Sequence, residues 1–390
     1  MSTAIPTANQ HGLAQHSHGA GVPVQTRSER FKSRDVADFA PVTGREAQWK
    51  LSPVAEFADL LDGSLDGSPL PIEEVLADGV SLSRIPLTDP RVSKAGLPEE
   101  RASANALSQA ADALLISITG ETDRTSTVQR VGLGSEPRAA HTVIEAAAHS
   151  RALLVLSGSG PARLTENVEI LVGEGAELTV VSLQQWSDDA VHLASHFARL
   201  ARDAKLTHIV VSLGGKVVRV NPSSHLAEPG SEIEALGLYF SDAGQHLEQQ
   251  VYVFHDAPHT KSRVTYKGAL QGQGARTVWI GDVLIGNRAT GTDSYEQNRN
   301  LVLTEGTRAD SIPNLEIETG DIQGAGHASA TGRFDDEQLF YLQARGIPED
   351  EARRLVVRGF LNEIVQRIHD TELQERLGVA LEAELAGGNE

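Results

Sequence analysis

Histidine is the side chain in this sequence best suited to bind a transition metal, because the chain contains no cysteine. The run His255-Asp-Ala-Pro-His259 places two imidazoles and a carboxylate within a short segment. Such a set suits a hard or borderline metal if a turn brings the rings together. Pro258 excludes the regular helix that would put both rings on one face, so a polar loop with scattered histidines is the favoured interpretation.

A third histidine, His327, has unusually small neighbours. It lies in the run Gly324-Ala-Gly-His-Ala-Ser-Ala-Thr-Gly332, where a ligand or a partner's backbone can come close. By residue type alone, a histidine in such a run is more often packed than liganded, so spacing leaves both interpretations open.

Three glycine-rich segments do not form nucleotide sites. Leu213-Gly-Gly-Lys-Val217 lacks the first Gly and the Ser or Thr of a phosphate-binding loop. Gly158-Ser-Gly160 and Gly272-Gln-Gly274 do not continue to the third Gly of a dinucleotide fingerprint. Neither a nucleophile elbow nor a zinc-protease helix occurs, so the sequence offers no recognisable site for ATP hydrolysis or for these hydrolase chemistries.

The composition limits the classes of molecule that this chain is expected to bind. The formal net charge is −19, from 53 acidic and 34 basic residues, which disfavours a nucleic-acid partner. Without cysteine there is no disulfide and no thiolate metal site. No apolar run reaches the ~18 residues of a membrane span, and the first residues do not resemble a signal peptide. We therefore expect a cytoplasmic protein without a membrane partner.

Residues 136–325 are predicted to form a β core, because short apolar runs alternate there with Gly, Asn, Asp and Pro. Ala190 to Lys205 is ambiguous and is interpreted as a strand. Gly followed by a small residue precedes several strands, as a solenoid corner requires, but the irregular spacing leaves a sandwich or barrel open on pattern alone. The clearest predicted strands are 168–172, 178–183, 216–220, 232–240, 276–285 and 300–303.

The two ends differ from this core. Residues 1–30 lack apolar periodicity and are predicted to be a disordered tail. Residues 31–135 are predicted to be mostly helical, with Trp49 as an anchor, and residues 326–390 to form a helical C-terminal domain. Two apolar stripes run along the C-terminal helices, and each needs a partner surface on this chain or on another; this chain is favoured. The stripes are Ala352, Leu355, Val356, Phe360, Ile364 and Ile368, and Leu373, Leu377, Leu381 and Leu385.

The stretch from Asp321 to Ile347 resembles the C-terminal signature of the SufB/SufD family, the scaffolds on which iron–sulfur clusters are built. The stretch from Ser28 to Lys50 is similar to the N-terminus of SufD-type members. Further similar stretches follow in the family's order: 259–268, 297–303, 313–318, and 345–352 leading into 359–364.

This resemblance implies a mainly β fold, a right-handed parallel β-helix between an N-terminal helical region and a C-terminal helical domain. It also implies a non-enzymatic scaffold subunit of the SufBCD complex. Such a subunit pairs with SufB through the β-helix and docks the SufC ATPase through the C-terminal helical domain. The candidate partner-binding residues are Phe340, Arg345, Gly346, Leu355, Phe360 and Ile364.

SufB-type members commonly carry a Cys before the histidine that matches His327, whereas Gly324-Ala-Gly326 precedes it here. The resemblance therefore implies the SufD type, with His327 as a candidate iron or cluster ligand at the SufB interface and the sulfur supplied by the partner. A neutral imidazole can occupy a cluster coordination site. No cofactor is expected to stay bound to this chain alone, and His255 and His259 remain alternative metal ligands.

Two other functions stay open. One is a stand-alone homodimeric structural protein, since the edge that pairs with SufB can also pair with itself. The other is a carbohydrate-active β-helix enzyme of the pectate-lyase kind. The missing signal peptide and the aromatic content of 4% disfavour that enzyme.

Overall fold

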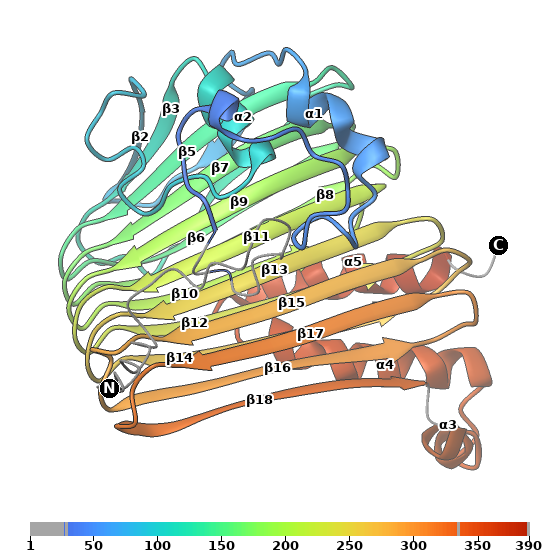
Figure 1. The fold of residues 1–390 in the computed structure, drawn as a ribbon. Coiled ribbons are helices and arrows are strands. Elements are labelled where there is room, and N and C mark those ends of the chain that lie inside the picture. The colour runs from blue at the N-terminus through green and yellow to red at the C-terminus, as the bar shows by residue number, and fades with distance from the viewer. Residues whose placement is uncertain (1–26, 28–29, 334–335, 388–390) are drawn as a thin grey trace, which may run out of the picture.

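Residues 27, 30–333 and 336–387 are described in the computed structural model of the protein. Nearly all of the predicted disordered tail, 1–30, lies outside the described residues. Between Ile72 and Arg333 the chain forms a solenoid of about 8 turns (Figure 1). The prediction of a parallel β-helix is confirmed, and the sandwich and barrel alternatives are wrong.

Two nine-stranded sheets form the walls of the solenoid, and from β3 onward successive strands alternate between them. All neighbouring strands are parallel except the first pair of each sheet, β1 with β4 and β2 with β3. The first sheet contains β1 (Ile72–Val75), β4 (Ser126–Arg130), β6 (Arg151–Gly160), β8 (Glu177–Trp186), β10 (Lys205–Ser212), β12 (Glu232–Ser241), β14 (Lys261–Leu270), β16 (Thr292–Val302) and β18 (Ile322–Arg333). The second contains β2 (Val80–Ile85), β3 (Ala113–Ile118), β5 (Arg138–Ala146), β7 (Arg163–Val172), β9 (Val191–Leu200), β11 (Val217–Leu226), β13 (His246–His255), β15 (Arg276–Ile285) and β17 (Arg308–Ile317).

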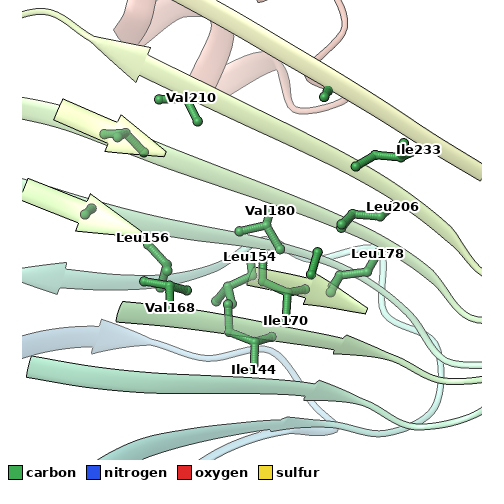
Figure 2. Packing of buried hydrophobic residues seen from close by; sticks show 14 of the residues in the cluster. Ile144, Leu154, Leu156, Val168, Ile170, Leu178, Val180, Leu206, Val210 and Ile233 are labelled. Carbon is green, nitrogen blue, oxygen red and sulfur yellow. The ribbon is translucent and has the colours of Figure 1, made fainter. Parts of the chain in front are cut away.

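Aliphatic side chains fill the space between the sheets. Because side chains alternate along a strand, every second residue points inward and stacks on its counterpart in the next coil. Leu154, Val180 and Ile170 lie in this interior (Figure 2). The ambiguous segment from Ala190 forms β9, as predicted, and contributes Ala194 to the same core.

The C-terminal helices α4 (Glu349–Val365) and α5 (Thr371–Gly387) cover the outer face of the first sheet. Leu361 and Ile364 of α4 and Leu377 of α5 are buried against that sheet in one apolar cluster. The interpretation that the apolar stripes pack on their own chain is thus confirmed for most of their length. The shorter helix α3 (Asp336–Gln343) precedes them near the end of β18 (Figure 1).

The N-terminal region covers the outer face of the second sheet. It contains two short 3-10 helices, η2 (Val36–Asp38) and η3 (Val54–Phe57), with α1 (Ala58–Asp62) and α2 (Arg101–Gln109). Trp49 is 1% exposed and packs in a cluster with Phe57 and Val191, so it anchors this region as predicted.

The solenoid is longer than the predicted range 136–325. Strands β1 to β4 lie within 31–135, which is therefore not mostly helical, and β18 continues to Arg333 in the predicted helical domain. The early strands are short, and most of β1 is exposed, so they carry little apolar alternation. Most residues of β18 are Gly, Ala, Ser or Thr and lack the apolar side chains that mark a strand.

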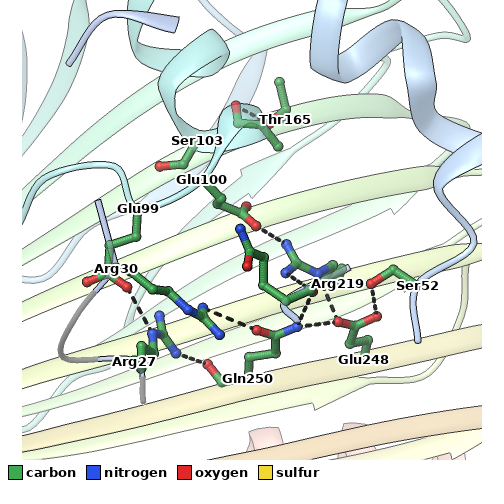
Figure 3. A network of polar contacts seen from close by, with 12 residues as sticks. Arg27, Arg30, Ser52, Glu99, Glu100, Ser103, Thr165, Arg219, Glu248 and Gln250 are labelled. Atoms are coloured by element: carbon green, nitrogen blue, oxygen red, sulfur yellow. Dashed lines mark hydrogen bonds and ion pairs between the residues drawn. The ribbon is translucent and has the colours of Figure 1, made fainter. Parts of the chain in front are cut away.

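Arg219 holds the N-terminal cover to the second sheet (Figure 3). Its guanidinium bonds Glu100 at 2.5 Å and Glu248 at 2.9 Å, and lies 4.1 Å from the centroid of the Trp49 ring. Burial alone would raise the pKa of Glu248, but Arg219 and the hydrogen bonds from His246 and Ser52 outweigh it and lower that pKa to about 2. Glu248 is therefore ionised at neutral pH, beside the Arg219 guanidinium.

Across the described ranges, no helix is both long and apolar enough to cross a membrane.

Candidate functional site at the open end of the solenoid

Strands β17 and β18 form the last coil, and each lies at the edge of its sheet. They end the solenoid on the side away from α1 and α2 (Figure 1). In the described part of the chain no further strand pairs with β18 beyond β16. An edge strand offers unpaired backbone N–H and C=O groups along one side. This end of the molecule is thus open for another strand to add.

His327 lies in β18 and belongs to its inner face. In register it stands beside Glu296 of β16. Two residues further along, the Ser329 hydroxyl lies 2.8 Å from that of Ser311 on β17, across the interior. Because alternate residues share a face, the imidazole lies on the same inner side, at the open end, where it is exposed.

Directly beneath this position lies Glu296, which the sequence analysis did not identify. Its side chain is 1% exposed, and among the described residues neither carboxylate oxygen has a hydrogen bond of good geometry. Burial, with a contribution from Asp282, raises the pKa of Glu296 to about 8, against a smaller effect of the Asn314 backbone amide. The alternation Ser294, Glu296, Asn298 was the signal in the sequence, since every second residue faces inward.

The structure does not bring His255 and His259 together as a metal site. His255 is buried at the end of β13, with Nδ1 2.8 Å from the Thr260 hydroxyl and Nε2 2.9 Å from that of Ser262. Burial lowers the pKa of His255 to about 3, and both ring nitrogens already have partners. Within the described ranges, no group of three or more His, Asp or Glu side chains is arranged to hold a metal.

The predicted partner-binding residues fall into two sets. Ile364 is 1% exposed and Phe360 half-buried, and both pack against the first sheet, so Ile364 offers no surface to a partner. Phe340 is 72% exposed and Leu355 44% exposed. The Arg345 guanidinium lies 4.4 Å from the centroid of the Tyr341 ring on α3. Gly346 follows that helix with a φ of 86°, which favours glycine.

Comparison with known proteins gives the family. The family described as "SUF system FeS cluster assembly, SufBD core domain" matches residues 129–360, more than half of the chain. The chain belongs to the SufBD family. Membership supports a role for this SufBD protein in iron–sulfur cluster assembly. The matched range includes β17, β18 and His327, and so contains the open end of the solenoid.

Relatives match this SufBD protein over nearly all of its length. The iron-sulfur cluster assembly SufBD family protein Mb1497 of Mycobacterium bovis is 46% identical over 371 residues, which cover 92% of this chain and 93% of the relative. Protein ML0594 of Mycobacterium leprae is 44% identical over 377 residues, covering 94% and 96%. A second M. bovis family protein, Mb1496, is 31% identical over 201 residues, covering 52% of this chain and 24% of the relative.

Proposed function

We propose that this SufBD protein is a cytoplasmic, non-enzymatic scaffold subunit of the SufD type in a SufBCD cluster-assembly complex. The observation that carries the proposal is the open end of the solenoid, where two edge strands and the exposed His327 share one surface. A surface of this kind serves to pair with another chain rather than to enclose a substrate.

Pairing with SufB takes place through β17 and β18. Exposed strand edges recruit further strands through main-chain hydrogen bonds, and a second solenoid offers a matching edge. Two M. bovis family proteins are similar to this chain, one throughout and one over only 24% of its own length. Two unlike family members in one organism fit a pair of unlike subunits.

His327 serves this interface as a ligand for iron or a nascent cluster, which is the cargo of assembly. This chain has no cysteine, so the sulfur and any thiolate ligands come from the partner. An imidazole on the inner face of an edge strand lies where two joined solenoids meet.

The SufC ATPase docks on the C-terminal helices. The apolar stripes of α4 and α5 already pack against the first sheet. SufC therefore docks on residues of the C-terminal helices that remain exposed. Phe340, Tyr341 and Leu355 offer apolar surface on and near α3. Exposed aromatic residues of this kind are enriched at protein interfaces.

Native co-purification tests the proposal. The tagged chain, expressed with SufB and SufC, should recover both partners, and its mass in solution should change from that of the chain alone. His327→Ala should keep the complex intact and lower its iron content, because only the imidazole is removed. Recovery of neither partner, together with a stable homodimer, would instead support the stand-alone structural protein.

A further inference from the structure

The interior below the last coil holds a carboxyl group without a hydrogen bond of good geometry in the described structure. Glu296 is 1% exposed, and neither of its oxygens has a hydrogen bond of good geometry among the described residues, although the Asn314 backbone N–H lies close enough to lower its pKa. A buried carboxyl group with so few partners destabilises a fold in its ionised form, unless it takes up a proton or a cation. Its presence beside the exposed histidine therefore points to a ligand.

The surroundings of Glu296 make room for the carboxyl group and favour a cation near it. Its Oε2 lies 2.5 Å from where a Cβ atom would stand on Gly281, so the missing side chain provides the space. The Trp279 indole borders the same glycine, and within the described residues its Nε1 has no acceptor. The negative field of Asp282 opposes ionisation of Glu296, and a bound cation would offset that repulsion.

The strand register places a second candidate metal ligand, His327, directly above Glu296. Glu296 and His327 are partners on neighbouring parallel strands, about 4.8 Å apart, and both belong to the inner face. One carboxylate and one imidazole are donors that ferrous iron and other divalent first-row metals accept. Since no described group supplies three such ligands, the remaining positions would come from water or from the chain that pairs with the open end.

We propose that Glu296 is a metal ligand which, together with His327, forms this chain's half of a ferrous-iron site at the open end of the solenoid. The inference rests on the proposed function, since it adds a carboxylate to the site at which His327 acts. It assigns to this chain two of the ligands that receive iron, and leaves the sulfur to the partner.

Anaerobic titration with Fe²⁺ tests this inference on the full chain, alone and paired with SufB. The dissociation constant is measured by competition with a coloured chelator. Glu296→Gln keeps the shape of the side chain and should weaken Fe²⁺ binding at least ~10-fold, as changes around metal ligands do. Glu305→Gln removes an exposed acid from the turn before β17 and should leave affinity unchanged.

The outcomes separate the two proposals. If His327→Ala weakens Fe²⁺ binding and Glu296→Gln does not, the present inference is overturned while the role of His327 stands. If neither change has an effect, the iron-binding part of the proposed function fails as well. If the Glu296→Gln variant does not fold, the Glu296→Asp variant is used in its place. Aspartate keeps the carboxylate but is shorter, so its oxygens lie further from the metal position. Wild-type affinity in that variant would equally overturn the assignment.

Discussion

Replacing Arg219 by methionine removes the cation shared by two buried carboxylates. The Arg219 side chain is 1% exposed, and its partners Glu100 and Glu248 are 7% and 0% exposed. Breaking a buried ion pair from one side costs about 3–5 kcal/mol, because the remaining charges stay buried without compensation. The pKa of Glu248 gives a similar figure, since a decrease from 4.5 to about 2 corresponds to about 3 kcal/mol.

The same network predicts how this loss depends on pH. The lowered pKa of Glu248 stabilises the wild-type fold above pH 4.5, and that stabilisation is lost as the pH falls toward 2. Without Arg219, burial is opposed only by His246 and Ser52, so the pKa of Glu248 should rise. The destabilisation of the variant should then be largest near neutral pH and decrease when acid protonates the carboxylate. The difference between wild type and variant should therefore be smaller at about pH 5 than at about pH 7.

Urea unfolding followed by far-UV circular dichroism measures this difference at both pH values. Arg358→Met serves as the control, because Arg358 and Glu382 pair at 3.3 Å with side chains that are 53% and 40% exposed. Exposed pairs of this kind contribute about 0–1 kcal/mol. A loss below about 1 kcal/mol for Arg219→Met, or a loss that is the same at both pH values, would refute the reasoning.

Two further changes test the solenoid itself. Gly268→Ala should lower the free energy of unfolding by about 1–3 kcal/mol, because its Cβ would stand 1.8 Å from the buried Tyr239 ring. Gly320→Ala is the control and should change the free energy of unfolding little, because a Cβ there would have no atom within 4 Å. Equal urea midpoints for the two variants would contradict this prediction. Lys205→Glu should lower the melting temperature, because Lys205 lies in register between Glu177 and Glu232 and like charges on adjacent strands repel by up to about 1 kcal/mol. High salt should reduce that shift, and a shift that salt does not change would argue against repulsion.

The sequence predicted seven of the 18 described strands, because their short runs of Val, Ile, Leu and Thr are bounded by turn residues. The predicted run 276–285 coincides with β15, where nine of ten positions are buried. Trp49 was recognisable as an anchor, because a large aromatic side chain among polar residues needs a core to enter. Strand β18 was not predicted, because most of its residues are Gly, Ala, Ser or Thr. These small residues do not form the alternation of large apolar and polar side chains by which a strand is predicted.

Sequence proximity was a poor guide to the candidate metal site. His255 and His259 are close in the chain, but the strand directs His255 into the interior, where hydroxyl groups occupy both nitrogens. Glu296 and His327 are far apart in the chain, yet one turn of the solenoid brings them side by side. The number of residues in each coil determines which residues pair on neighbouring strands. Because the corners differ in length, that number cannot be predicted from the spacing of the turn residues in the sequence.

By itself, the sequence determined the family resemblance, the β core and the absence of cysteine, because residue types and alternation are local properties. It also showed that the C-terminal helices carry apolar stripes needing a surface. Only the tertiary structure decided which surface, namely the outer face of the first sheet. Only it showed that the last coil stays uncovered, with His327 exposed above a buried Glu296. Both facts depend on strand register and on which faces meet, and contacts between residues distant in the chain determine these.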